Sequence, residues 1–423
     1  MACRCRFHRR LKDSGIGYLP NKTVYLDYNA TAPVDPGVLG AFEAACRRSW
    51  GNPSSLHAAG VEAWELVEGV RQGIGQLLNL DPDGIHFCTG GTEALHAGIF
   101  GYIARHGGFF GNSSNGNSSS GNSFSSASVG AGVPSCRIIS TRIEHSSLEH
   151  PLFMARHTGI PVEYLSVDSQ GKIDLQELKT LVLPEDLVVL SPVNHETGSR
   201  QPVGEIFKVV HEAGGILMLD AVQAAARLSP SEWTPYCHMA AVSGHKIYAP
   251  KGIGFLYKRP GLRISRFRFG GGQEGGMFPG TENVPGIASL GRAFEMMEKN
   301  RSEESAVLAT LSRETPWILK KQGVEMVVES PADAVPGVLN LSFPWINDME
   351  TFLYRLNKEN ICVSRFSACT ERVGGESRIL TEMGRGPGRA STSLRIAFGR
   401  WSKREDIFTL ARILVGMQRA FNV

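Results

Sequence analysis

Short apolar runs alternate with amphipathic, helix-like segments through the first 260 residues, and this alternation limits the folds open to the chain more than any other feature. Apolar runs that are bounded by turn residues and separated by helical segments are typical of a mostly parallel α/β sheet. We therefore expect such a sheet, beginning with the run VYLDY. Its later strands are expected in IHFC, RIIS, PVEYL, LVVLS, GILMLD, MAAVSG and GIGFLYKR.

A helix is predicted after the first strand and a turn. Asp35 is suited to cap its N-terminus, and Pro36 is suited to its first position. Several apolar residues then recur at helical spacing, so one face of this helix is expected to be buried. That face comprises Val38, Leu39, Phe42, Ala45 and Cys46.

The length of 423 residues is too great for one compact core. We expect a basic tail at 1–23, a large α/β domain at 24–295 and a smaller α+β domain at 296–423. The segment 107–135 is almost wholly Gly, Ser and Asn, and it cannot bury enough apolar area to offset the entropy lost on ordering. It is therefore expected to be a mobile loop without a chemical role.

The charges argue against nucleic acid as a partner. The 44 basic and 41 acidic residues leave a net charge of +3, and no basic stripe occurs beyond the first ten residues. No apolar run is long enough for a spanning helix, so no membrane association is expected. The eight cysteines are scattered without paired CxxC clusters, which indicates a reducing compartment and no metal site.

The N-terminal residues bear on the compartment. MACRCRFHRR is rich in Arg but lacks an apolar region and a cleavage-like site of small residues, which favours a solvated basic tail on a cytoplasmic protein. A mitochondrial presequence is the alternative, because the segment has no acidic residue before Asp13.

Lys246 follows the apolar run MAAVSG and precedes a turn rich in Pro and Gly. A lysine in such a place is most often a side chain whose stem is buried and whose ammonium reaches water. A lysine that binds an aldehyde cofactor as an imine needs four kinds of support from neighbouring groups. All four can be sought at the ends of upstream strands.

Polar residues at these strand ends match the four requirements. The turn with Gly91 and Thr92 offers backbone N–H groups to a phosphate. Asp220 and Gln223 can contact a pyridine nitrogen and a phenolic oxygen, and His145 can cover the ring. Each residue alone has an ordinary structural alternative, such as a tight turn or a capped strand end. Together, at the ends where open α/β sheets bind ligands, they predict a cofactor site.

The order of short motifs resembles that of the pyridoxal-phosphate-dependent cysteine desulfurases, which are NifS-like enzymes of aminotransferase class V. The resemblance covers residues 24–420, and its most specific motifs are SGHKIYAPKGIG and SAC. The others are LDYNATAP, GNPSSLH, TGGTEA, EHSSLEHP, NHETG, LDAVQ, GGGQEGG, PGTEN and SLRIAFGR. It implies the type I fold of pyridoxal-phosphate transferases, with a mostly parallel seven-stranded sheet, helices on both faces and a smaller α+β domain. It also implies a homodimer with shared active sites.

The resemblance further implies pyridoxal 5′-phosphate as cofactor and L-cysteine as substrate. Lys246 would hold the cofactor as an imine and move the substrate α-proton, while His145 would stack on the ring and assist that transfer. Arg395 would pair with the substrate carboxylate, a task that suits a planar guanidinium. The remaining cofactor positions would be Gly91, Thr92, His195, Asp220, Gln223, Ser243, His245 and Thr281, the last reaching the phosphate of the neighbouring subunit.

Cys369 matches the persulfide cysteine of this family. It lies among small and polar residues near Arg365 and Arg372, so its thiol is expected to be exposed on a mobile segment, whereas Cys362 lies in an apolar run typical of a core. The resemblance implies that Cys369 takes sulfur from L-cysteine and that L-alanine is released. The persulfide would then pass to an acceptor protein, for iron–sulfur cluster formation or other sulfur metabolism.

Four positions depart from the family pattern. His195 and His96 stand in place of Asn, while Gly275 and Phe278 stand where Arg is common. These changes are expected to leave cofactor capture intact and to affect substrate affinity, turnover and substrate choice. Selenocysteine lyase, which releases selenide from L-selenocysteine, is the nearest alternative function. A catalytically impaired scaffold is the second alternative, and retention of Lys246 argues against it.

Overall fold

The computed structural model describes residues 23–107, 136–266, 268–366 and 375–421. Their central feature is a seven-stranded sheet with the order β2-β8-β7-β6-β5-β3-β4. β8 is antiparallel to both of its neighbours, and the other adjacent pairs are parallel. The strands are β2 (Ile85–Cys88), β3 (Ile138–Thr141), β4 (Val162–Leu165), β5 (Leu187–Leu190), β6 (Ile216–Asp220), β7 (Met239–Ser243) and β8 (Gly254–Lys258). Each overlaps one of the predicted runs, and β3 extends one residue beyond RIIS, so the mostly parallel sheet is confirmed.

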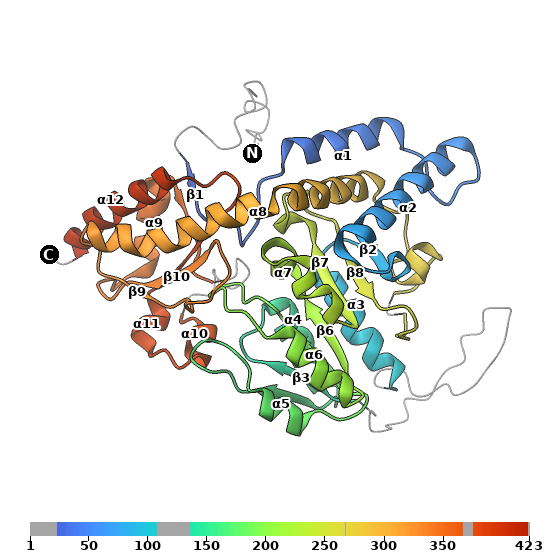
Figure 1. Cartoon of the computed structure of the whole chain (residues 1–423), viewed down its shortest axis with the longest axis horizontal. Coiled ribbons are helices and arrows are strands. Elements are labelled where there is room, and N and C mark those ends of the chain that lie inside the picture. The colour runs from blue at the N-terminus through green and yellow to red at the C-terminus, as the bar shows by residue number, and fades with distance from the viewer. Residues whose placement is uncertain (1–22, 108–135, 267, 367–374, 422–423) are drawn as a thin grey trace, which may run out of the picture.

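Helices cover both faces of this sheet, which explains why its strands are apolar throughout. Along β5, Leu187 and Val189 pack with α3 and α4, whereas Val188 and Leu190 pack into the core on the opposite face. The core that contains Val188 and Leu190 also includes residues of α2, α6, α7 and the first half of α8 (Figure 1). The helices of this part are α1 (Pro36–Arg48), α2 (Ala58–Leu78), α3 (Gly91–Arg105), α4 (Ser146–His157), α5 (Leu175–Leu181), α6 (Val203–Glu212), α7 (Val222–Arg227) and α8 (Val284–Lys321).

A separate core lies at the other end of the molecule (Figure 1). It is built on a three-stranded antiparallel sheet with the order β12-β10-β9. The strands are β9 (Val327–Val328), β10 (Val338–Ser342) and β12 (Ser393–Ala397), and the helices are α9 (Met349–Lys358) and α12 (Arg404–Phe421). Two short helices, α10 (Arg378–Glu382) and α11 (Pro387–Ser391), instead form a small cluster with Ile143. α8 contributes to two cores. Ile287 and Phe294, in its first half, pack with Val188 and Leu190 of the large sheet, whereas Leu311, in its second half, packs in the core of the three-stranded sheet. The boundary predicted at 295 falls inside α8, and the division into two domains stays a prediction.

The run VYLDY does not begin the large sheet. Its strand β1 (Val24–Tyr25) pairs in parallel with β11 (Ile361–Cys362) to form a separate two-stranded sheet. The reason lies in its packing, because Val24 and Leu26 belong to the same core as α12. The amino-terminal strand is therefore part of the smaller end of the molecule.

The prediction for the first helix is confirmed at its start and partly wrong on its buried face. Asp35 caps α1 by accepting a hydrogen bond from the Gly37 N–H at 2.8 Å, and Pro36 is its first residue. Val38 and Ala45 are buried, but Leu39 is 52% exposed and Cys46 is also exposed. α1 packs against α8 (Figure 1), and Leu39 and Cys46 lie on the part of its surface that stays uncovered in one copy of the chain.

Candidate active site

The carboxyl ends of β6 and β7, the start of α3 and the loop after β5 meet around one cavity of about 280 Å³. One predicted position lies elsewhere, because Thr281 lines a different pocket together with Phe278. Cys369 falls outside the described residues. The cavity brings together Gly91, Thr92, His145, His195, Asp220, Gln223, Ser243, His245, Lys246 and Arg395. Residues predicted from separate motifs therefore share one site.

Lys246 ends a short 3₁₀ turn that directly follows β7. Its Nζ donates hydrogen bonds to the carbonyl oxygens of Asn29 at 2.6 Å and Ala30 at 2.7 Å. Tyr248, two residues further on, has a φ of 69°, which is unusual for a bulky side chain and marks a strained turn. The amine is thus held by a segment from the amino-terminal part of the chain, at the floor of the cavity.

The start of α3 can accept an anion at the cavity wall. Among the described residues, no side chain caps this helix, so its first N–H groups remain available to a ligand. A Cβ atom added at Gly91 would lie 2.6 Å from Val222 Cγ2, which explains the requirement for glycine. Ser243, at the end of β7, lies against the same glycine, since that Cβ atom would also lie 3.6 Å from Ser243 Cβ.

Asp220 and Gln223 follow β6 and lie on the cavity wall. Burial raises the pKa of Asp220 to about 6, and the nearby Lys246 ammonium opposes this rise. Gln223 Nε2 donates to the Asn29 carbonyl at 3.2 Å, while its Oε1 has no hydrogen-bond partner among the described residues. An unpaired buried amide oxygen beside a carboxylate indicates a place for a polar ligand.

His145 caps the N-terminus of α4. Its Nδ1 accepts hydrogen bonds from the Ser147 N–H at 3.1 Å and from Ser147 Oγ at 2.7 Å, so the ring proton of the neutral form lies on Nε2. Burial lowers the pKa of His145 to about 4, which keeps the ring neutral near pH 7. The ring of His195 meets it edge to face, with centroids 4.9 Å apart. Burial also lowers the pKa of His195 well below its ordinary value.

Arg395 reaches the cavity from β12 and is 1% exposed. Its Nη2 donates to Asp27 Oδ1 at 2.8 Å, and its Nη1 donates to the His195 carbonyl at 3.2 Å. Its Nε has no partner among the described residues. A fixed guanidinium that still has unused N–H donors is suited to a small carboxylate.

Sequence reasoning missed several residues that hold the site together. Asp27 orients Arg395, and the carbonyl of Asn29 receives both Lys246 and Gln223. Both lie in the motif LDYNATAP. The sequence feature that could have revealed them is an acid and an amide placed within a short apolar run.

Glu144, the residue before His145, was missed as well. It is buried and accepts hydrogen bonds from Thr141 Oγ1 at 2.8 Å and from Ser191 Oγ at 2.6 Å. Burial raises the pKa of Glu144 to about 7, and the two hydroxyl hydrogen bonds oppose this rise. The available signal was an acid directly beside the predicted histidine.

The other departures from the family pattern lie away from this cavity. His96 packs edge to face on Phe100, with ring centroids 5.6 Å apart, and Phe278 is buried among apolar residues of the large sheet. Gly275 has a φ of 63°, a left-handed conformation in which a side chain is strained. Among these four positions, only His195 lines the cavity.

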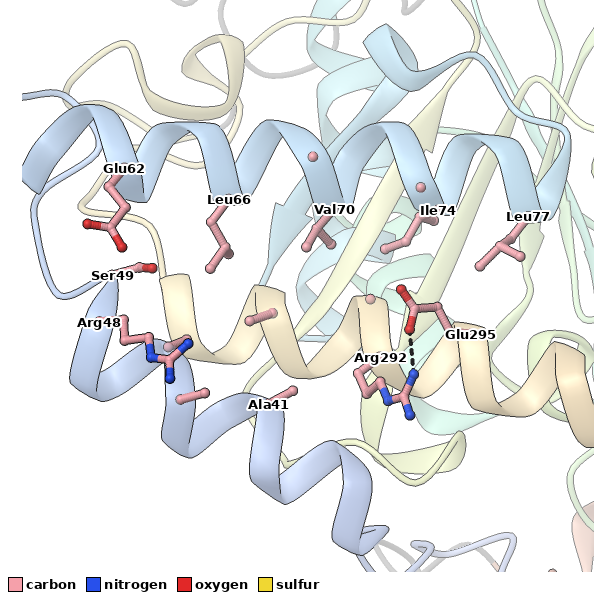
Figure 2. Close-up of a pocket in the computed structure, with 16 residues that line it drawn as sticks. Ala41, Arg48, Ser49, Glu62, Leu66, Val70, Ile74, Leu77, Arg292 and Glu295 are labelled. Carbon is pink, nitrogen blue, oxygen red and sulfur yellow. Dashed lines mark hydrogen bonds and ion pairs between the residues drawn. The ribbon is translucent and has the colours of Figure 1, made fainter.

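A larger groove of about 500 Å³ lies between α1, α2 and α8 (Figure 2). Leu66, Val70, Ile74 and Leu77 of α2 point toward α8 across it, and its only labelled ion pair joins Arg292 to Glu295 at 2.8 Å. None of the predicted site residues lines this groove, so choosing the active site by cavity volume alone would give the wrong location.

Comparison with known proteins agrees with the geometry. Residues 24–107 and 118–410 match the model of the aminotransferase class-V family, so the chain belongs to that family. It is 34% identical over 401 residues to a cysteine desulfurase of Nostoc sp. (strain PCC 7120 / SAG 25.82 / UTEX 2576), covering 92% of each chain. It is 30% identical over 404 residues to a human cysteine desulfurase, covering 94% of this chain and 82% of the relative. A solved NifS-like protein superposes with a TM-score of 0.81 at 29% identity, over 94% of this chain and 100% of that one.

Pyridoxal phosphate is the cofactor of this family, and the cavity fits it. Gly91 leaves room where a Cβ would collide, and the uncapped start of α3 provides phosphate donors. Gln223 Oε1 lacks a partner within the described part of the chain, Asp220 supplies a buried carboxylate, and Lys246 supplies the amine. The donor set thus offers complementary groups to the phosphate, the ring nitrogen and the aldehyde.

Proposed function

We propose that this protein removes sulfur from L-cysteine, releasing L-alanine and leaving a persulfide on Cys369. The observation that carries the proposal is the single cavity that gathers Lys246, Asp220, His145 and Arg395. The similarity to cysteine desulfurases over more than nine-tenths of the chain supports the same conclusion.

When bound, pyridoxal phosphate supplies a ring that accepts the electron pair left after the substrate loses its α-proton. Lys246 would hold the cofactor aldehyde covalently and then take up and return that proton at Nζ. Asp220 would keep the pyridine nitrogen protonated, and a carboxylate nearby favours that cation. The neutral His145 would cover the ring and present its Nε2–H.

Arg395 would bind the substrate carboxylate through N–H groups that its contacts with Asp27 and the His195 carbonyl leave unused. Because these contacts exist in the protein alone, little rearrangement is needed when substrate arrives. The ring of His195 stands beside the same position, so its replacement of Asn is expected to tune substrate affinity.

Sulfur transfer would proceed by attack of the Cys369 thiolate on the substrate sulfur. A sulfur–sulfur bond forms, the carbon–sulfur bond breaks, and its electron pair stays with the substrate carbon chain. Protonation of that carbon gives alanine, so cysteine and the enzyme thiol become alanine and an enzyme persulfide. The terminal sulfur would then pass to an acceptor protein.

The protein is also proposed to act as a homodimer, as is typical of related desulfurases. Thr281 lines a pocket separate from that of Lys246, which supports a role toward the partner's cofactor. Large apolar side chains near α1 and α2 are exposed, including Trp50 at 72% and Leu56 at 97%, which supports burial against a second copy. Among the described residues, no helix has the length and apolar character needed to span a membrane.

The decisive experiment is incubation of the purified protein and pyridoxal phosphate with L-cysteine, with alanine and persulfide measured over time. Release of alanine with persulfide on Cys369 is expected, and absence of alanine would refute the proposal. Selenocysteine lyase, the alternative raised by the sequence, receives no specific support from the relatives above. L-Selenocysteine assayed in parallel compares the two substrates, and inactivity toward both would favour a scaffold.

A further inference from the structure

Tyr248 has an unusual backbone conformation two residues after Lys246. Its φ is 69°, in the left-handed region that bulky side chains avoid because of steric clashes. Five described residues other than glycine have a positive φ, and Tyr248 is the only aromatic one among them. Of the others, Asn79 and Asn360 carry a side chain for which this region costs little. The conformation of Tyr248 must therefore be held by its contacts.

The side chain of Tyr248 is held by two residues that follow β12. It is 8% exposed, and its Oη accepts a hydrogen bond from the Arg400 backbone N–H at 2.8 Å. The Arg400 guanidinium lies over the ring, with Cζ 4.2 Å from the centroid, and the Trp401 ring meets it edge to face with centroids 5.4 Å apart. Because β12 also carries Arg395, the strand that provides the proposed carboxylate ligand leads directly to these contacts.

Arg400 is itself held firmly. Its Nη1 pairs with Asp35 Oδ2 at 2.5 Å, and its Nε pairs with Glu304 Oε1 at 2.5 Å. Asp35 is the N-cap of α1 and Glu304 lies in α8, so two helices fix the guanidinium. An arginine that is paired at its nitrogens and stacked on an aromatic face makes one of the stronger contacts of this kind. The ring of Tyr248 thus rests on a rigid support.

The backbone on both sides of Lys246 is joined to the segment that holds its amine. The His245 carbonyl accepts from the Ala32 N–H at 2.8 Å. The Tyr248 carbonyl accepts from the Asp35 N–H at 3.0 Å. The two carbonyls that accept from Lys246 Nζ shortly precede Ala32 on the same stretch of chain. The direction of the Lys246 side chain therefore depends on the turn that Tyr248 completes.

We propose that Tyr248 is a positioning residue, which keeps the turn after Lys246 in its left-handed conformation and so holds the amine in place for the cofactor aldehyde. The inference rests on the proposed role of Lys246 and adds a residue outside the lining of the cavity. Without the contacts of its ring, the backbone of a bulky residue returns to negative φ and the turn relaxes. Strain that the surrounding structure maintains is typical of functional sites.

The test measures how fast the cofactor-loaded protein loses pyridoxal phosphate after transfer to buffer without it, in the absence of substrate. Tyr248→Ala removes the ring and should lose the visible absorbance band about ten-fold faster than the parent, as expected when one strained conformation is no longer held. Tyr248→Phe keeps the ring beneath Arg400 and loses only the Oη acceptor, so its rate should stay within about three-fold of the parent.

Tyr248→Asn distinguishes backbone conformation from packing. Asparagine adopts the left-handed conformation at low cost without any ring, so this variant should keep the cofactor at least about three-fold longer than Tyr248→Ala. A ring that only fills space would give no such recovery, because neither replacement fills that space. Tyr248→Leu is the second variant if Tyr248→Ala does not fold. It keeps much of the apolar volume but loses both Arg400 contacts, so it should also lose the cofactor about ten-fold faster.

Phe352→Ala is the control for a general loss of stability. Phe352 is fully buried in the smaller core, where its ring neighbours are Phe343 and Trp345. The variant should lower the free energy of unfolding in urea and keep the parental rate of cofactor loss.

A parental rate of cofactor loss in Tyr248→Ala or Tyr248→Leu would overturn the positioning role. Equal rates in Tyr248→Asn and Tyr248→Ala would also overturn it, as would a comparable acceleration in Phe352→Ala. Borohydride reduction of the loaded parent, followed by peptide mass analysis, tests the proposed function separately. Cofactor fixed on Lys246 is expected, and a parent without it would refute the proposed role of Lys246 itself.

Discussion

Three carboxyl groups around the cavity carry raised pKa values because they are buried. The pKa of Asp220 rises to about 6, and the pKa values of Glu144 and Glu196 rise to about 7. A buried acid destabilises the folded protein once it is ionised, so each must be held by hydrogen bonds from neighbouring hydroxyl or N–H groups. At the scale of single residues, the site is built at the expense of stability.

Glu144→Gln should reveal this effect as a dependence of stability on pH. The pKa of Glu144 is raised from 4.5 to about 7, so its contribution to stability is present below pH 4.5 and is lost as pH rises through 7. From pH 5 to 8, the free energy of unfolding of the parent should fall relative to the variant by up to about 3 kcal/mol. Urea unfolding of both cofactor-free proteins measures the difference, and a constant difference across this range would contradict the assignment.

Variants of Lys246 and Cys369 are predicted to distinguish cofactor binding from sulfur transfer. Lys246→Ala removes the amine that binds the cofactor aldehyde and should abolish the visible absorbance band of the purified protein. Cys369→Ala should keep that band and lose more than about a hundred-fold in persulfide formation, because only the sulfur nucleophile is removed. Absorbance spectra and persulfide labelling distinguish the two, and parental sulfur transfer by Cys369→Ala would contradict the nucleophile assignment.

At the scale of elements, the sequence predicted what local patterns determine. β7 and the neighbouring strands are buried on both faces, so each appears as an apolar run between turns. β1 was assigned to the wrong sheet. Its two residues pair with Ile361 and Cys362, and a local sequence pattern cannot predict pairing with residues so far along the chain. Leu39 follows helical spacing, but spacing alone does not say which apolar stripe of α1 faces the core.

The N-cap of α1 offers a test at this scale. Asp35 is 4% exposed, caps the Gly37 N–H and pairs with Arg400 Nη1 at 2.5 Å. Asp35→Ala loses the cap and leaves a largely buried arginine with one partner fewer, which should lower the free energy of unfolding by about 3 kcal/mol. Asp81→Ala, which removes an exposed cap from a three-residue 3₁₀ turn, should cost less than about 1 kcal/mol in the same urea titration. Equal losses would contradict the importance of burial.

At the scale of the whole molecule, the site depends on both cores. Lys246 and Asp220 come from the large sheet, whereas Arg395 comes from β12 in the smaller one. Lys246 and Asp220 could be predicted because they follow strands that local patterns reveal. The role of Asp27 could not, because it depends on Arg395, which lies 368 residues further along the chain.

Exposed apolar side chains around the start of α2 should control the oligomeric state. Leu56 is 97% exposed and Trp64 is 52% exposed, which is unusual for such side chains unless a partner covers them. If the parent is the proposed dimer, sedimentation equilibrium at the same concentration should show the double variant Leu56→Asp with Trp64→Asp as a monomer. It should also bind pyridoxal phosphate more weakly if Thr281 acts across the interface.

Trp317→Asp is the matched control for this prediction, because Trp317 is 56% exposed on the second half of α8, within the part packed into the smaller core. It should leave the mass of the parent assembly unchanged. A double variant with the same mass as the parent would show that the surface around α2 is not the interface.

The pairing of β1 with β11 has a consequence for biosynthesis. Val24 and Tyr25 leave the ribosome early, but their partners Ile361 and Cys362 emerge only after most of the polypeptide has been made. The carbonyls that hold Lys246 lie just beyond β1, so their final placement must also wait for those late residues. A nascent chain that stalls before β11 lacks Ile361, Cys362 and Arg395, so it cannot complete the candidate site.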